Sequence, residues 1–183
     1  LLQHAGLPPA AFWLLRWYGV SLLVYLDFSG YSDIAIGLSR LLGYRIVENF
    51  DYPYLKPNIA AFWRSWHISL HLFIRDYFFF PLFGRATSRR KMMLGLLLAF
   101  VCSQVWHALS INFLALGAYH GALLVLWSLY ERWQTRRGRR PSSTRLSRVA
   151  GALLTFQLVT AGYWLFFWGQ APLGAPRAHS QPS

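Results

Sequence analysis

The sequence predicts an all-α fold, a polytopic transmembrane helical bundle that also contains interfacial, amphipathic helices. The first supporting observation is composition: of 183 residues, 55% are hydrophobic and 13% are charged, whereas soluble domains usually carry about 25% charged residues. The second is the stretch 92–130, which contains no Asp, Glu, Lys or Arg. Because a helix needs about 20 apolar residues to cross the hydrocarbon core, this stretch is long enough for two spans.

The first third of the chain predicts one weaker span followed by a short amphipathic helix. Residues 10–26 are uncharged except for Arg16, whose long side chain can reach the headgroups from near a helix end. Residues 34–42 place apolar side chains at helical spacing. One of the two polar residues at 32–33 is the expected N-cap of this second helix, which should end at Gly43.

The middle of the chain predicts an amphipathic helix over 59–77, with Asn58 as its N-cap. Its polar residues recur at helical spacing and form one stripe beside an apolar stripe. The polar stripe comprises Arg64, His67, His71 and Arg75. Such a helix lies in the membrane interface, or packs within a bundle with its polar stripe on a water-filled cavity.

The second half of the chain predicts a helical hairpin and a final span. The uncharged stretch turns near 110–112, and a last transmembrane helix covers 149–168, before a tail over 169–183. More than half of the 18 basic residues fall in the two loops that flank the hairpin, 85–91 and 131–148. A two-span hairpin places both loops on one side of the bilayer, and the positive-inside rule makes that side cytoplasmic. The expected location is therefore the inner (plasma) membrane, with several spans.

The formal net charge of +12 first suggests a nucleic-acid partner. We exclude nucleic acid because the cations lie in loops beside long uncharged stretches, so the partner they indicate is the membrane lipid bilayer. Cys102 is the one cysteine of the sequence, which excludes a disulfide scaffold, and we expect an inert buried thiol. Because the chain begins at Leu1 rather than Met, we expect the later part of a larger protein.

Three histidines are candidates for chemistry, because ionisable groups at membrane depth are costly and usually have a role. A neutral imidazole is the usual general base near pH 7, and His107, inside the uncharged stretch, is the leading candidate. His67 is the second candidate. For His120 we favour a structural role in packing. A structural role also stays open for His107. His67 and His71 have the i, i+4 spacing of metal ligands, but no third ligand has compatible spacing, so we predict no metal. We expect His71 to face solvent or headgroups.

Four ordered motifs resemble those of the membrane-bound O-acyltransferase family, most closely its bacterial alginate O-acetyltransferase branch. They lie within 24–133 and comprise residues 27–38, residues 48–54, residues 62–77, and the Trp106-His107 pair followed by 119–121. The resemblance implies an all-helical bundle whose tunnel brings a cytoplasmic acyl donor to an extracytoplasmic acceptor. It also implies that residues 1–183 form part of an acyltransferase domain that has further spans upstream.

The activity implied by the resemblance is that of an enzyme, an O-acyltransferase that moves acyl groups, most often acetyl, to hydroxyls of an extracytoplasmic polysaccharide. The resemblance makes His107 the catalytic base and His67 its assistant. The donor would be acetyl-CoA or an acyl-carrier thioester, used as a co-substrate with no bound cofactor. The acceptor would be the polysaccharide or a periplasmic transferase partner. The family pattern Trp-His-Gly appears here as Trp106-His107-Ala108, a departure that leaves donor and acceptor preference open.

Further candidates for substrate binding are polar or aromatic side chains within these motifs: Arg64, Arg75, Asp76, Trp106, Asp27, Asp33 and His120. For Asp27 and Asp33, helix capping and hydrogen bonds to tyrosines are explanations as good as substrate binding. Three other functions stay open: D-alanyl transfer to teichoic acid, acetyl transfer to peptidoglycan, and a non-catalytic subunit that relays acyl groups to a separate transferase. The motif over 27–33 favours acetyl transfer to a polysaccharide.

Overall fold

The computed structural model describes residues 8–84, 88–138 and 144–167, and every regular element within them is helical. The longer helices are α1 (Pro9–Leu41), α5 (Arg89–Val105), α6 (Ile111–Arg136) and α7 (Arg145–Phe167). The shorter elements are η2 (Pro53–Leu55), α2 (Ile59–Ser65), α3 (Ile68–Ile74), η3 (Arg75–Phe79) and α4 (Phe80–Phe83). The predicted all-α class is confirmed for these residues, while the predicted tail over 169–183 lies outside them.

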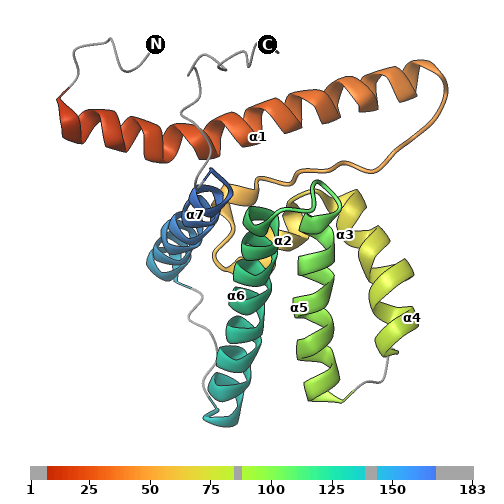
Figure 1. Cartoon of the computed structure of the whole chain (residues 1–183), viewed down its shortest axis with the longest axis vertical. Helices are drawn as coiled ribbons and strands as arrows, with labels where there is room; N and C mark the ends of the chain where they lie inside the picture. The colour runs from red at the N-terminus through yellow and green to blue at the C-terminus, as the bar shows by residue number, and fades with distance from the viewer. Residues whose placement is uncertain (1–7, 85–87, 139–143, 168–183) are drawn as a thin grey trace, which may run out of the picture.

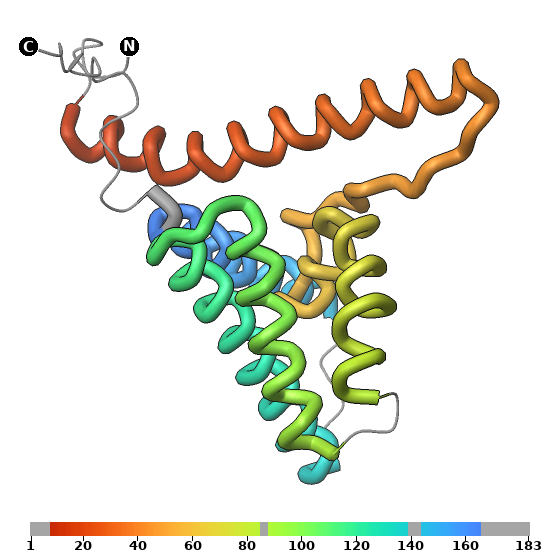
Figure 2. Tube along the Cα trace, turned by 45° about the vertical axis from the view of Figure 1, so that its right-hand side comes forward, coloured from red at the N-terminus to blue at the C-terminus, as the bar shows by residue number. Residues whose placement is uncertain are grey.

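Helices α5 and α6 form an antiparallel hairpin, with α7 packed against α6 (Figure 1). Helix α1 runs across the end of the hairpin at which α5 leads into α6, as Figures 1 and 2 both show. The short helix α2 lies at the centre of the hydrophobic core. The buried core side chains come from α2, from the residue after it and from the three long helices beneath α1: Ile59, Phe62, Trp66, Phe100, Leu124 and Val159. The core therefore fixes α2 and the segment that follows it against the hairpin.

Helix α1 corrects the prediction of two separate helices in the first third of the chain. It is one continuous helix of 33 residues, so the polar motif over 27–33 lies inside a helix. Ser32 caps no helix there, because its buried side chain accepts a hydrogen bond from Asn49 Nδ2 (3.1 Å). The predicted end is confirmed, since Gly43 adopts a left-handed φ of 83° that glycine tolerates without steric cost.

The prediction of a single helix over 59–77 is wrong, because the chain breaks at Trp66 and His67. Trp66 is extended and forms an isolated antiparallel β-bridge with Phe50. His67 then takes a left-handed conformation, with φ 46° and ψ 55°. Backbone pairing with a distant segment replaces helical hydrogen bonds at this point, and helical periodicity in the sequence carries no sign of such pairing.

The N-cap predicted for this helix is confirmed, since Asn58 accepts a hydrogen bond from the Ala61 backbone N–H (2.8 Å). The predicted polar stripe is divided by the break. Arg64 is exposed on α2, whereas His67 and His71 line a cavity. The break therefore separates side chains that one regular helix would have kept on one face.

The hairpin predicted within 92–130 is confirmed. Helix α5 ends at Val105, and the chain turns over residues 106–110 before α6 begins. Ser110 caps α6 by accepting a hydrogen bond from the Phe113 backbone N–H (3.4 Å). The turn-compatible residues seen in the sequence thus mark the start of α6.

The two helices of the hairpin approach each other most closely at Gly117 and Gly121 of α6. A Cβ atom on Gly117 would lie 2.7 Å from Val101 Cα, and one on Gly121 would lie 2.9 Å from a Leu97 methyl carbon. Small residues four apart permit this close backbone approach between membrane helices. The two glycines therefore set the distance between α5 and α6.

Two helices of the described residues, α1 and α6, are long and apolar enough to cross a membrane. Helix α5 has 17 residues, fewer than the about 20 that a span requires. The predicted last span over 149–168 corresponds to α7, which has 23 residues. The number of spans in the polytopic bundle stays a prediction.

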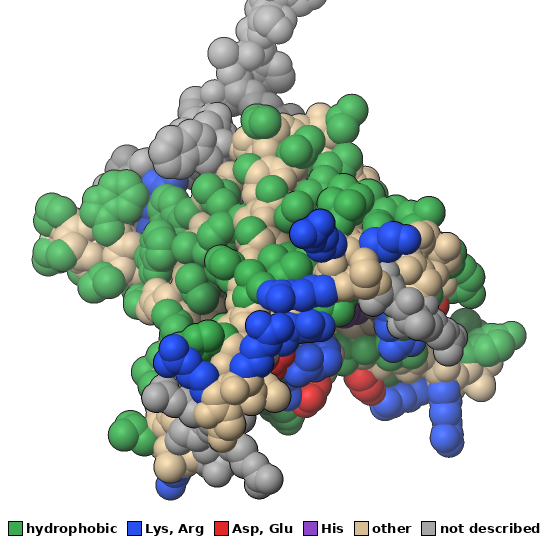
Figure 3. All heavy atoms as spheres, turned by 90° about the horizontal axis from the view of Figure 1, so that it is seen from below, with side chains coloured by type: hydrophobic (Ala, Val, Ile, Leu, Met, Phe, Trp, Pro, Cys, Tyr) green, Lys and Arg blue, Asp and Glu red, His purple; other side chains and the backbone are tan. Residues whose placement is uncertain are grey.

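The basic residues that flank the hairpin gather at one end of the molecule, as a two-span hairpin requires. The start of α5 and the end of α6 lie at the same end in Figures 1 and 2, and Figure 3 shows Lys and Arg side chains clustered over that end. The exposed cations there include Arg90, Lys91, Arg132, Arg136 and Arg137. Its cytoplasmic orientation stays a prediction, and residues 85–87 and 139–143 of the two loops lie outside the described part of the chain.

Candidate functional site

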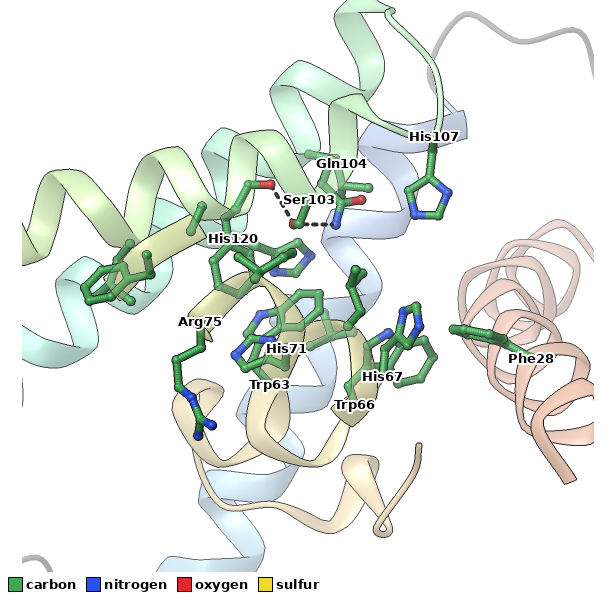
Figure 4. Close-up of a pocket in the computed structure, with 18 of the residues that line it drawn as sticks. Phe28, Trp63, Trp66, His67, His71, Arg75, Ser103, Gln104, His107 and His120 are labelled. Atoms are coloured by element: carbon green, nitrogen blue, oxygen red, sulfur yellow. Dashed lines mark hydrogen bonds between the residues drawn. The ribbon is translucent and has the colours of Figure 1, made fainter. Parts of the chain in front are cut away.

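A cavity of about 420 Å³ opens between the hairpin, the broken helix and α1 (Figure 4). Its wall is largely aromatic and aliphatic, with Phe28 contributed by α1 and Tyr163 by α7. Its polar lining includes His67, His71, Ser103, Gln104, His107 and His120. A concave, mostly apolar site with a few polar groups is typical of a site for a small molecule. The fold thus brings to one place four histidines that are spread over residues 67–120 of the sequence.

His107 lies in the turn that follows α5, where its backbone N–H donates to the Gln104 carbonyl (3.1 Å). Its ring is held between aromatic neighbours, with centroids 4.0 Å from Trp106 and 5.7 Å from Phe113. The residue is exposed, and the part of its surface that is buried lowers the pKa of His107 below the ordinary value. The imidazole is therefore neutral near pH 7 and carries a lone pair that can accept a proton.

His67 lies at the break between α2 and α3, and Figure 4 shows it on the broken helix, whereas His107 lies on the turn after α5. Its ring meets the Phe28 ring of α1 edge-on, with centroids 4.7 Å apart. Burial lowers the pKa of His67 to about 4, and the charges that His107 and His71 would carry lower it further. All three imidazoles line the same cavity, and burial is the main reason that His67 is neutral near pH 7.

His120 is the most buried of the four histidines, with 2% of its surface exposed. Its ring packs edge-on against Trp63, with centroids 4.8 Å apart, and lies so close to α7 that a Cβ on Gly162 would approach Nε2 to 2.5 Å. These contacts are those of a core side chain. His120 nevertheless lines the same cavity as His107, because α6 runs antiparallel to α5 and the neighbouring Gly121 packs against Leu97 in the middle of α5.

His71 corrects the expectation that it faces solvent or headgroups. It lines the cavity, with its ring parallel to that of Trp63 (centroids 6.4 Å apart) and 5.7 Å from that of Phe100. The break at His67 turns α3 so that this side chain faces inward. Within the described residues, no group of three His, Cys, Asp or Glu side chains could hold a metal ion.

Sequence reasoning missed Ser103 and Gln104 as lining residues. The Ser103 hydroxyl donates to the Phe100 carbonyl (2.8 Å), and Gln104 Nε2 donates to the Ser103 hydroxyl (3.4 Å). The signal was present, because a polar pair precedes Trp106-His107 inside an otherwise apolar stretch. The same region corrects one expectation: Cys102 is exposed rather than buried.

Arg75 lines the cavity, but its guanidinium points away from the histidines (Figure 4) and forms a bidentate ion pair with Asp76 (2.7 and 2.9 Å). The remaining substrate-binding candidates do not line the cavity: Arg64, Asp76, Trp106, Asp27 and Asp33. The two aspartates are exposed on α1, whose cavity-facing side carries Phe28 instead. This geometry gives their assignment to substrate binding no support.

Comparison with known proteins yields several relatives. Teichoic acid D-alanyltransferase of Bacillus subtilis is 32% identical over 160 residues, which cover 84% of this chain and 40% of that protein. The probable alginate O-acetylase AlgI of Pseudomonas aeruginosa is 36% identical over 143 residues, or 78% of this chain and 26% of the relative. Peptidoglycan O-acetyltransferase of Helicobacter pylori is 32% identical over 80% of this chain and 27% of the relative.

The chain thus spans between about a quarter and two fifths of the length of these relatives. The sequence pattern of the membrane-bound O-acyltransferase family matches residues 6–169, which include the whole of the cavity lining. The histidines that meet at the cavity all lie within the matched region. The chain belongs to the membrane-bound O-acyltransferase family.

Proposed function

We propose that this chain carries the catalytic histidines of a membrane O-acyltransferase that moves acetyl groups to hydroxyls of an extracytoplasmic polysaccharide. The observation that supports the proposal most directly is the meeting of His107 and His67 at one cavity (Figure 4). Both imidazoles are neutral near pH 7, since burial lowers the pKa of each. A neutral pair can supply one proton acceptor and one hydrogen-bond donor to the same substrate.

In the proposed reaction, the acceptor hydroxyl donates a hydrogen bond to the imidazole of His107. The imidazole removes the proton as the hydroxyl oxygen attacks the carbonyl carbon of an acyl thioester. The carbon–sulfur bond then breaks, and the imidazolium returns its proton to the departing thiolate, which restores the neutral histidine. A base positioned in this way typically contributes about 10²–10⁴-fold to the rate.

His67 assists by donating a hydrogen bond from the single N–H of its neutral imidazole to the carbonyl oxygen, on which negative charge develops during the attack. The aromatic wall around the pair supports this role, because a hydrogen bond to a developing charge is stronger where water is excluded. Phe28 and Trp66 provide that wall beside His67. In this proposal His107 acts as the base, and His67 donates a hydrogen bond to the oxyanion.

The proposed donor is acetyl-CoA or an acyl-carrier thioester on the cytoplasmic side, used as a co-substrate. The proposed acceptor is a polysaccharide hydroxyl or a periplasmic transferase that passes the group on. Acetyl is favoured over D-alanine because relatives named as alginate O-acetylases are 36–38% identical, against 32% for the Bacillus D-alanyltransferase. D-alanyl transfer is the second candidate, because that Bacillus relative matches 84% of the chain.

The test is His107→Gln in the full-length protein, in membranes supplied with radiolabelled acetyl-CoA. We expect label in the polysaccharide to fall about 10²-fold or more, with membrane insertion unchanged. Ser110→Ala is the matched control, because Ser110 lies in the same turn and does not line the cavity. Wild-type labelling in His107→Gln would refute the assignment of the base. Label that accumulates on the protein itself would instead indicate an acyl relay.

A further inference from the structure

The N-terminus of α3 is capped from a distance. His67 occupies the N-cap position, but its side chain makes no capping hydrogen bond, although N-cap side chains normally accept one from the first turn. Asn49 does so instead: its Oδ1 accepts from the Ser69 backbone N–H (3.1 Å) and from the Ser69 hydroxyl (2.7 Å). The imidazole of His67 is thereby left free to face the cavity.

The backbone around Asn49 holds both sides of the break. The Asn49 carbonyl accepts a hydrogen bond from the Ile68 N–H (3.1 Å), immediately after His67. The next residue, Phe50, forms the β-bridge with Trp66, immediately before His67. A left-handed residue other than glycine is strained and persists only where its surroundings over-determine it. For His67, these constraints are the hydrogen bond and the β-bridge made by Asn49 and Phe50.

Asn49 also ties the break to α1. Its Nδ2 donates to the Ser32 hydroxyl (3.1 Å), and Ser32 is 4% exposed. Phe28, one turn earlier on the same helix, meets His67 edge-on at 4.7 Å. The Asn49 side chain thus connects α1, which packs against His67, with α3, which follows His67.

We propose that Asn49 is the positioning residue of His67: by capping α3 and joining it to α1, it fixes the left-handed backbone that points the imidazole into the cavity. This inference rests on the proposed function, because the direction of His67 matters for transfer only if His67 acts there. It explains the Glu48-Asn49-Phe50 motif, which the proposed chemistry leaves without a role. It gives Asn49 no contact with substrate.

The experiment compares Asn49→Ala with Asn58→Ala in the full-length protein. Both asparagines cap a helix of the same region, but Asn58 caps α2 and does not hold the break. We expect Asn49→Ala to lower the acetyl-transfer rate per folded protein about 10²-fold, the scale of a misplacement by about 1 Å, and Asn58→Ala to leave it near the wild-type value. Asn49→Asp keeps the acceptor for Ser69 and can accept from the Ser32 hydroxyl, so it should restore most of the rate.

A double-mutant cycle separates positioning from stability. In a His67→Ala background, Asn49→Ala should cause no further loss, because the residue that it positions is gone. An equal loss in both backgrounds, or an equal loss from Asn58→Ala, would overturn the inference. The second readout is modification of His67 by diethyl pyrocarbonate, followed by mass spectrometry. We expect Asn49→Ala to raise this modification several-fold and Asn58→Ala to leave it unchanged.

The two readouts separate failure of the inference from failure of the proposed function. A fully active His67→Ala variant would remove His67 from the proposed chemistry. Raised modification of His67 in Asn49→Ala would still support positioning in that case, whereas unchanged modification would overturn it. A slow His67→Ala variant together with a fast Asn49→Ala variant would overturn the positioning role alone.

Discussion

The α5–α6 hairpin and the segment 49–69 reach the same cavity by different means. The hairpin consists of two continuous helices that pack through Gly117 and Gly121 and turn over residues 106–110. In the segment 49–69, helical hydrogen bonding stops at Trp66 and His67, and the chain there bonds to Asn49 and Phe50 instead. Local sequence preferences are sufficient for the first region, whereas the second depends on partners that come together only in the fold.

The difference extends to the histidines. His107 and His120 are delivered by a turn and a helix with local backbone hydrogen bonds, within a tightly packed hairpin. His67 is delivered by a strained backbone that hydrogen bonds from Asn49 stabilise. We therefore expect the hairpin to be sensitive to added bulk and the broken segment to be sensitive to lost hydrogen bonds.

The largest effect should come from pH, which tests the base delivered by the hairpin. In the proposed reaction the neutral form of His107 is the active one, and burial lowers the pKa of His107 below the ordinary 6.5. Activity should therefore persist as pH falls through 6.5 and disappear only at lower pH, in membranes permeabilised so that both sides share one pH. Initial rates of acetyl transfer measure this. An acid limb centred at or above 6.5 would contradict the environment that we assign to His107.

The next effect tests the packing of the hairpin. A Cβ on Gly117 would meet backbone atoms of Val101 at 2.7 Å, so Gly117→Ala must push α5 and α6 apart. We expect a loss of about 1–3 kcal/mol in the free energy of unfolding, seen as a lower Tm in detergent. Gly19→Ala is the matched control, because nothing lies within 4 Å of its added methyl group. Equal Tm values for the two variants would mean that the glycines do not set the interhelix distance.

The smallest effect compares one helix cap from each region. Asn58 accepts its capping hydrogen bond at 2.8 Å, whereas Ser110 accepts its own at 3.4 Å. Loss of a good N-cap costs about 1 kcal/mol, so Asn58→Ala should destabilise by about that amount and Ser110→Ala by less. Thermal unfolding of both variants in the same detergent decides this. A larger loss from Ser110→Ala would reverse our ranking of the two regions.

Much of the fold followed from patterns that act within a few residues. The uncharged stretch 92–130 predicted the hairpin. The N-cap at Asn58 and the helix end at Gly43 were also predicted correctly. The continuity of α1 through 27–33 was missed, because Ser32 bonds to Asn49 instead of capping a helix. A serine that could cap a helix cannot be told from one that bonds across the fold without knowledge of the partner.

The candidate site divides in the same way. The sequence by itself predicted His107 and His67 as site candidates, because ionisable groups at membrane depth are costly and the motifs that contain them resemble those of a family. The tertiary structure alone decided that His71 joins them and that Asp27 and Asp33 do not. The reason is physical: apolar periodicity records which faces are buried, whereas the direction of a side chain at a break depends on long-range hydrogen bonds. The α5–α6 hairpin was determined locally, and the geometry at His67 was determined by Asn49.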